Sequence, residues 1–226
     1  MKNSYLILFV VFSKFAAGQD FRQVLTAMQK EYKNAEQLNI VMNVKVFDNP
    51  ASVKPFYNEK VEICKDGSDY SYRYASNEML MNGDCMVMID HEAKEMVYSI
   101  RDAKAQEKYM SQFKFSMDSI LSFYETPEYK GTRDKTDHYK LIQKTGEVKQ
   151  VEFFINTDTH LIQRITYTYR EGQFVSIEFL KFDRHPSFKA GQFDERQFVT
   201  KVKDKLTPSA HFSQYKVWDA NAETEK

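Results

Sequence analysis

The sequence is poor in cysteine, glycine, proline and tryptophan, and it carries no excess of either charge. Its 226 residues include 2 Cys, 7 Gly, 5 Pro and 1 Trp, and 32 basic residues balance 32 acidic ones for a formal net charge of +0. So little glycine and proline is not typical of a linker-rich or low-complexity chain. Because there is no basic excess to hold a phosphate backbone, the sequence predicts no nucleic-acid partner.

Motifs of catalysis and metal binding are missing as well. The sequence holds no Gly-x-Ser-x-Gly, phosphate-binding loop, Cys-x-x-Cys, His-x-His or His-Glu-x-x-His. The five histidines are scattered: His91, His138, His160, His185 and His211. We interpret them as solvated loop residues rather than as metal ligands. The sequence therefore predicts a protein that is not an enzyme and that needs no cofactor or metal.

The first 18 residues have the pattern of a secretory signal peptide. Lys2 precedes an apolar stretch over residues 5–12, and small residues mark a cleavage site after Gly18. The apolar stretch is too short to span a membrane, Lys14 interrupts its continuation, and no later stretch has the length of a span. We therefore expect an exported protein, periplasmic or else secreted, with residues 19–200 as its one domain.

Two cysteines, Cys64 and Cys85, would meet an oxidising compartment after export. The turn in "MNGDC" is expected to place Cys85 opposite Leu80, which separates it from the strand that carries Cys64. A disulfide needs close Cα atoms, so whether the two thiols are bonded stays open.

Residues 21–33 predict an amphipathic helix. Apolar side chains recur at helical spacing from Phe21 through Leu25 to Tyr32, charged residues fill the opposite side, and Asp20 can cap the first turn. A membrane-surface helix is the alternative, but the short length and mixed charge favour docking on the rest of the fold.

Alternation of apolar and polar residues predicts strands along most of the remaining chain. Six runs come first, over residues 38–47, 59–64, 69–75, 78–81, 85–90 and 95–100. Residues 104–124 lose the alternation and predict one or two short helices, and a polar loop is expected from there to Lys135. Four runs follow, over residues 138–145, 151–156, 161–169 and 174–182.

The last three of these runs predict an open antiparallel sheet with one apolar and one wet face. The apolar face is expected to carry Val151, Phe153, Ile155, Leu161, Ile165, Tyr167, Tyr169, Val175, Ile177 and Phe179. The wet face is expected to carry Glu152, Arg164, Thr166, Thr168 and Glu178. The C-terminal part comprises residues 201–226. Short edge elements are predicted by "FDERQF", just before this part, and by "HFSQYKVW", within it. The final "DANAETEK" predicts a disordered tail.

The order of these elements resembles the LolA/LolB family of periplasmic lipoprotein carriers. The stretches "VLTAMQKEYKNAEQLNIVMNVKV", "NGDCMVMIDHEAKEMVYS" and "VEFFINTDTHLIQRITYTYREGQFVSIEFLKFDRHPSFKAGQFDERQF" carry the likeness, which covers most of residues 20–200. The carriers also have an Arg-Pro pair and a Phe-Arg-Trp-like run. Here the corresponding stretch reads "KPFYNEKVEICKDGSDYSYRY". No functional arginine is therefore carried over.

The resemblance implies an α+β, mainly β fold, in which a curved antiparallel meander forms an incomplete barrel with an N-terminal helix and a helical lid. It also implies a carrier that binds lipoprotein or other acylated lipid and meets envelope membrane proteins for loading and release. An apolar concave face costs roughly 25 cal/mol per Å² when it stays wet, so a lid or an acyl chain should cover it. The expected cavity residues are Met42, Val44, Tyr72, Met81, Met88, Phe153, Ile165, Tyr167 and Ile177, and the expected lid residues are Phe113, Phe115, Met117, Ile120, Leu121, Phe123 and Tyr124.

Two rivals stay open. An envelope structural or protein-interaction domain could use the same fold with a permanently filled interior, and each of these residues taken singly is typical of plain core. A hydrolase, which the sequence favours less, would be supported by a buried Ser or Asp beside a loop histidine.

Overall fold

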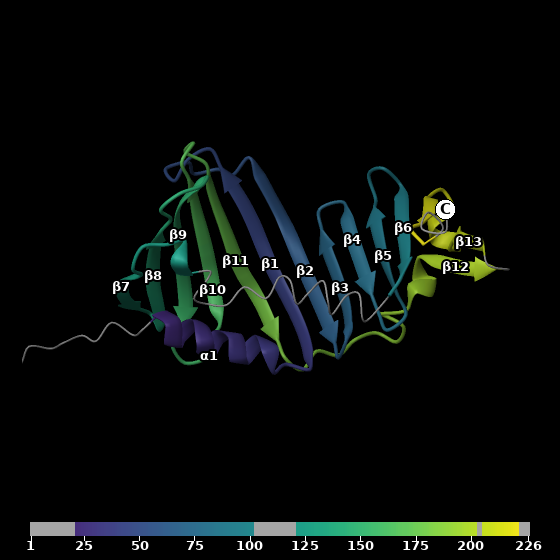
Figure 1. Ribbon diagram of the computed structural model, residues 1–226, viewed down its shortest axis with the longest axis horizontal. Coiled ribbons are helices and arrows are strands. Elements are labelled where there is room, and N and C mark those ends of the chain that lie inside the picture. Colours follow the sequence, from purple (N-terminus) through teal and green to yellow (C-terminus); the bar gives the residue numbers. More distant parts are fainter. Residues whose placement is uncertain (1–20, 102–120, 203–204, 222–226) are drawn as a thin grey trace, which may run out of the picture.

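The computed structural model describes residues 21–101, 121–202 and 205–221 (Figure 1). The described part contains the helix α1 (Phe21–Lys33) and the short 3-10 helices η1 (Glu195–Gln197) and η2 (Ala210–Phe212). Its strands are β1 (Gln37–Phe47), β2 (Tyr57–Asp66), β3 (Asp69–Tyr74), β4 (Asn77–Met81), β5 (Cys85–Asp90), β6 (Glu95–Ile100), β7 (Glu128–Arg133), β8 (Thr136–Ile142), β9 (Val148–Asn156), β10 (Ile162–Tyr169), β11 (Phe174–Asp183), β12 (Val199–Val202), β13 (Lys205–Pro208) and β14 (Lys216–Asp219).

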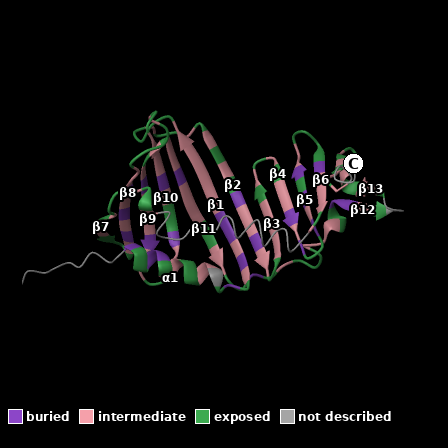
Figure 2. Cartoon of the chain, in the orientation of Figure 1, coloured by how far each residue is buried: buried purple, intermediate pink, exposed green. Residues whose placement is uncertain are grey.

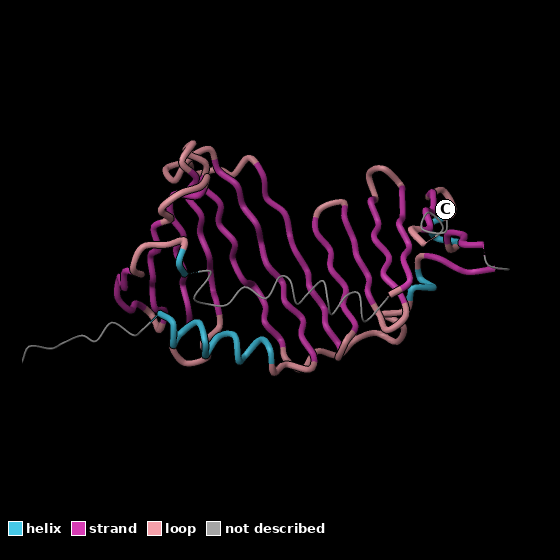
Figure 3. The backbone as a smooth tube through the Cα atoms, in the orientation of Figure 1, coloured by secondary structure: helices cyan, strands magenta, loops and turns pink. Residues whose placement is uncertain are grey.

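One large sheet dominates the molecule. Twelve strands form it in the order β14-β6-β5-β4-β3-β2-β1-β11-β10-β9-β8-β7, and β12 and β13 form a separate hairpin. β1 pairs with both β2 and β11, so it joins an early meander to a late one, and only β14 runs parallel to its neighbour, β6. The sheet curves but stays open, with β7 and β14 at opposite edges (Figure 3). This confirms the expected half-barrel of antiparallel strands with an N-terminal helix.

The helix α1 lies across one face of β8–β11 and β1, which we call the inner face (Figure 1). Its predicted apolar side packs there, and the Phe21 ring centroid lies 4.9 Å from that of Tyr139 and 5.4 Å from that of Phe153. Phe21 is 4% exposed, and burying such a side chain stabilises the fold by about 1.5–3 kcal/mol. The predicted helix, docked on the sheet, is confirmed.

The C-terminal segment, residues 185–202 and 205–221, covers the opposite, outer face of β4–β6. Cys85, Val87 and Met96 are 0% exposed beneath it, in a cluster with Phe198 and Val199 (Figure 2). The end of the segment is ordered further than predicted. Asp219 belongs to β14, and the next two residues hydrogen-bond to β6, so what remains of the expected tail, residues 222–226, lies outside the described residues.

Two local predictions about the late meander are wrong. Residues 128–133, expected as loop, form the edge strand β7, whose register shifts between Tyr129 and Gly131, where the glycine has φ 110°. An edge strand does not have to alternate apolar and polar residues, so the polar sequence of β7 gave no strand signal. In β10, Ile162 is the buried residue rather than Leu161, because the register shifts between Ile162 and Arg164.

Two predicted positions on the outer face also differ. Thr166 is only 6% exposed, because it lies in a row with the longer side chains of Lys45 and Glu152 on nearby strands.

Leu80 lies opposite Val87, so Cys85 is not opposite Leu80. Cys64 and Cys85 are both free, and β3 and β4 separate their strands. Three strand spacings amount to about 14 Å, twice the Cα separation that a disulfide can bridge.

Candidate ligand-binding surface

A row of apolar side chains continues the inner face beyond α1 and across the early meander. Residues directly opposite each other in paired strands share a face, so the strand registers define this row. It runs through Ile40, Ile63, Tyr72, Met79, Met88, Val97 and Trp218, one from each of β1–β6 and β14. We call these seven residues the inner row. Six strand spacings make it about 29 Å long.

The exposure of the inner row rises away from α1. Ile40 is buried in a cluster with Tyr32 of the helix, whereas Met88 is 43% exposed and Trp218 is 42% exposed. Within the described residues, none of the three buried clusters contains a side chain from the inner face of β3–β6. This part of the sheet therefore leaves an extended apolar surface accessible to solvent, which is uncommon on a protein without a partner or ligand.

Tyrosines on β2 and β3 add uncharged aromatic surface beside the row. Tyr70, Tyr72 and Tyr74 share the inner face. Burial raises the pKa of Tyr72, and a hydrogen bond to Tyr74 raises the pKa of Tyr57 to about 12. Tyr57 and Tyr72 therefore stay neutral at ordinary pH.

Charge borders the row at its far end. The register places Asp90, Glu95 and Lys216 together in the neighbouring row of the inner face. The Lys216 ammonium also lies 3.3 Å from the Trp218 ring centroid, a cation–π contact. The surface thus offers an apolar track with an ionic margin.

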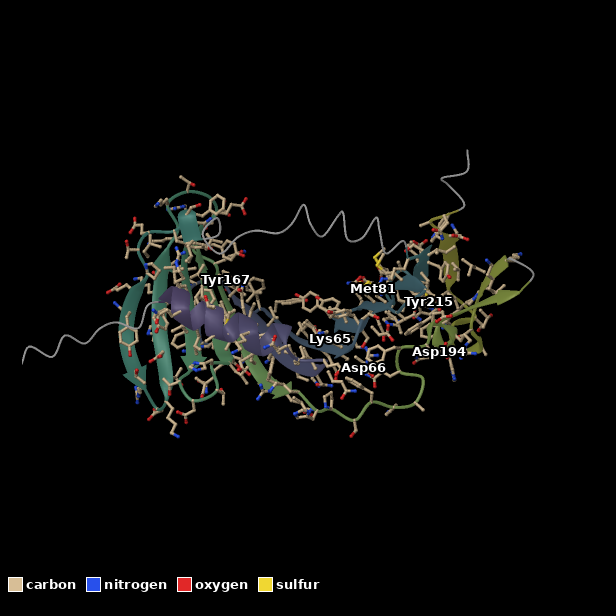
Figure 4. All side chains as sticks on the ribbon, turned by 60° about the horizontal axis from the view of Figure 1, so that its bottom comes forward. Lys65, Asp66, Met81, Tyr167, Asp194 and Tyr215 are labelled. Atoms are coloured by element: carbon tan, nitrogen blue, oxygen red, sulfur yellow. The ribbon has the colours of Figure 1, made fainter. Side chains whose placement is uncertain are left out.

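All nine residues expected to line a cavity lie on this inner face. Met42, Val44, Ile177, Ile165 and Phe153 belong to β1 and β9–β11, and Tyr167 lies on the same face of β10, one row away (Figure 4). Tyr72, Met81 and Met88 lie on β3–β5. Phe153 and Ile165 pack against the α1 cluster, and Met42 packs against the cluster around Ile40, so these three contribute to the core.

The expected lid falls mostly outside the described residues. Phe113, Phe115, Met117 and Ile120 are not described. Leu121 and Tyr124 pack against the cluster that contains Phe21, and Phe123 is 54% exposed.

Two histidines are held in networks rather than solvated in loops, which corrects the sequence-based interpretation. His91 Nδ1 lies 2.9 Å from the Tyr215 hydroxyl, and its Nε2 lies 3.1 Å from a Glu78 carboxylate oxygen. The other Glu78 oxygen accepts a hydrogen bond from Arg73 at 2.7 Å. This series of hydrogen bonds links the sheet to the C-terminal segment, so it helps to hold the segment in place.

His138 lies on β8, and its ring stacks on Phe154 with centroids 4.4 Å apart, while Arg164 covers Phe154 at 3.9 Å.

The buried carboxylate of Asp137 accepts hydrogen bonds from Thr132 and Tyr129. Among the described residues, no group of three or more His, Cys, Asp or Glu side chains could hold a metal ion.

Polar hollows lie on the outer face. One of about 520 Å³ separates β2–β4 from the C-terminal segment and is lined by Cys64, Arg73 and Glu78 among others. Another of about 680 Å³ lies over β7–β10 beside His138 and Arg164. Their charged linings suit neither an acyl chain nor another apolar ligand.

Sequence reasoning missed several members of the exposed surface. Met79 and Met86 share a face with Met81 and Met88, and the period of two together with the "NGD" turn could have found them. Trp218 left no such signal, because a parallel pairing between β14 and β6 connects residues far apart in the chain.

Comparisons with known proteins give structural likeness only. No protein-family model and no curated protein matches the chain. A solved structure of an uncharacterized conserved protein from Thermus thermophilus has a TM-score of 0.49 at 9% identity, over 89% of this chain and 99% of that one. A LolA superfamily protein from Nitrosomonas europaea has a TM-score of 0.35 at 10% identity, over 76% of this chain and 96% of that one.

The lipoprotein LppX of Mycobacterium tuberculosis has a TM-score of 0.42 at 10% identity, over 74% of this chain and 97% of that one. These scores describe a distant similarity of shape. No helix among the described residues combines the length and apolarity that crossing a membrane requires. A curved, open antiparallel sheet with α1 on its inner face gives the chain a LolA-like fold.

Proposed function

We propose that the chain is a non-catalytic, exported carrier that binds the acyl chains of a lipoprotein or another acylated lipid on its inner face and carries them through the periplasm towards the outer membrane. The part of the inner row outside the core clusters, from Tyr72 to Trp218, supports this proposal. Its four strand spacings make it about 19 Å long, which exceeds the half-thickness of about 15 Å that one acyl chain spans in a bilayer. Covering it with an acyl chain would remove apolar surface from water at about 25 cal/mol per Å².

In this proposal the protein discriminates little between acyl chains and more between the polar headgroups attached to them. An acyl chain offers no polar group to recognise, whereas Glu95 and Lys216 at the margin can meet a polar headgroup. Membrane proteins that load and release the cargo are implied by such transport.

Native mass spectrometry of the protein purified from an envelope fraction, with lipid analysis of the extract, tests the proposal. Met88→Asp places a charge in the inner row at a side chain that is 43% exposed. Ile100→Asp is the matched control, because Ile100 is 58% exposed on the outer face of the neighbouring strand. We expect co-purifying acylated species in the wild type and the control, and their loss in Met88→Asp with thermal stability unchanged.

A mass without lipid that stays unchanged when lipoprotein or lipid is added would overturn the carrier proposal. That result favours the rival, an envelope structural or protein-interaction domain with a permanently filled interior.

A further inference from the structure

Four of the ten methionines gather on two adjacent strands of the inner face. The sequence around the β4–β5 turn contains Met-x-Met twice, at Met79 and Met81 and again at Met86 and Met88. In the paired strands Met79 lies directly opposite Met88, and Met81 lies directly opposite Met86. Strand alternation places all four side chains on the same face, so the hairpin presents a two-by-two array of thioethers.

The spacing of this array suits one metal ion. Directly opposite residues hold their Cβ atoms about 4.5–5.5 Å apart. Two sulfur ligands of one ion, each about 2.3 Å from the metal, lie at most about 4.6 Å from each other. A methionine has three rotatable side-chain bonds, so the sulfur atoms can converge from these Cβ positions without moving the backbone. Figure 4 shows Met81 on the part of the sheet away from Tyr167, where the helix does not lie.

Solvent reaches the array at Met88. Met88 is 43% exposed, and the other three side chains are half-buried. The neighbouring positions on β3 are Tyr70, opposite Met81, and Tyr72, opposite Met79. Aromatic rings beside the array favour a cation through their π faces. The nearby carboxylate of Asp90 accepts hydrogen bonds from the backbone of its own turn at 2.9 Å.

We propose that Met79, Met81, Met86 and Met88 form a binding site for a soft monovalent metal ion, with Cu(I) as the ion it fits. Neutral thioethers are ligands that select Cu(I), whereas Zn²⁺, Ca²⁺ and Mg²⁺ require imidazole, thiolate or oxygen ligands. The two thiols of the chain are not part of the site, because Cys64 and Cys85 are buried on the outer face. This proposal does not require lipid binding, although Met79 and Met88 also belong to the inner row that the carrier proposal assigns to an acyl chain.

Competition for Cu(I) against bicinchoninate under anaerobic conditions tests the site, with Ag(I) titration followed by native mass spectrometry as a second readout. The variants replace methionine by leucine, which keeps the apolar volume and costs less than about 1.5 kcal/mol at each site. One variant changes Met79 and Met88, and another changes all four. Met42→Leu on β1 of the same face is the matched control.

We expect one ion per chain in the wild type and in Met42→Leu. Losing two direct ligands should weaken binding by at least as much as losing an outer-shell partner, so by tenfold or more. The fourfold variant should lose the site, and X-ray absorption of the bound copper should show sulfur neighbours. Because the thiols are the same in every variant, the difference between variants isolates the thioethers.

Absence of Cu(I) binding, or binding that the leucine variants retain, overturns the metal proposal. Single replacement of the 43% exposed Met88 keeps the test available should the fourfold variant fold poorly. Lipid co-purification measured on the same leucine variants separates the two proposals, because leucine preserves the apolar row that the carrier proposal needs.

Discussion

Truncating Phe198 should release the C-terminal segment from the outer face while the rest of the sheet stays folded. Phe198 is 6% exposed, packs in the cluster with Val87 and Met96, and lies 5.4 Å from the ring of Phe212. Phe→Ala at such a position costs about 3–5 kcal/mol. If this free-energy cost falls on the docking of the C-terminal segment, the fraction of molecules with an undocked segment rises at least about a hundredfold, since each 1.4 kcal/mol is a factor of ten.

Cys85 reports this opening. It is 0% exposed beneath the segment, and burial raises its thiol pKa to about 11. At pH 8 the closed form therefore offers iodoacetamide almost no thiolate, whereas the open form exposes an ordinary thiol. Peptide mass spectrometry of the alkylated protein should show labelling of Cys85 about a hundredfold faster in Phe198→Ala than in the wild type.

Phe21→Ala provides the matched control for this prediction. Phe21 is 4% exposed and packs α1 on the far half of the sheet, so its truncation removes a comparable side chain without touching the segment. Equal labelling rates in the two variants would refute the reasoning, because they would show that Cys85 is exposed only by global unfolding. An unchanged rate in Phe198→Ala would refute it as well.

Three further predictions concern polar and titratable groups. The stability that Cys85 contributes should be fully present below pH 9 and fall by roughly 3 kcal/mol as the pH rises towards 11, because the unfolded thiol ionises at its ordinary value while the folded one keeps its proton. Urea unfolding at pH 8 and 10.5 checks this, and Cys85→Ala should make the slope shallower by that amount, leaving the part that Cys64 and the buried tyrosines cause. Tyr215→Phe should cost about 1 kcal/mol in thermal unfolding, since it removes only the hydrogen bond to His91. Thr132→Val should cost about 1–3 kcal/mol in urea unfolding, because it takes a donor from the buried Asp137 carboxylate, whereas an unchanged midpoint would contradict this role.

Local pattern predicted most elements, because helix and strand formation depends on near neighbours. The helix at residues 21–33 and the strands β1–β6 and β8–β11 follow from apolar periodicity and turn residues. The strand β7 escaped prediction because an edge strand buries little and this one carries a glycine at its register shift. Ile162 replaced Leu161 in the core because the register irregularity between Ile162 and Arg164 changes the face of the residues before it, while Ile165 and Tyr167 after it keep the predicted face.

Pairing across the sheet decided which apolar residues stay exposed. The run "CMVMID" is apolar on both faces. Val87 and Ile89 are buried on the outer face by the C-terminal segment, whereas Met86 and Met88 stay on the inner face. From the sequence alone, such a run indicates only burial, because nothing in it says which face a distant segment will cover.

The sequence by itself determined that the chain forms an antiparallel, mainly β domain with an amphipathic N-terminal helix, and that large apolar side chains alternate along its strands. Only the tertiary structure decided that α1 covers one half of the inner face and the C-terminal segment covers the other half on the outside. It also decided that Trp218, through the parallel pairing of β14, completes the inner row. Periodicity is a local property of the chain, whereas the covering of a face depends on contacts between residues more than a hundred positions apart, which local periodicity does not encode.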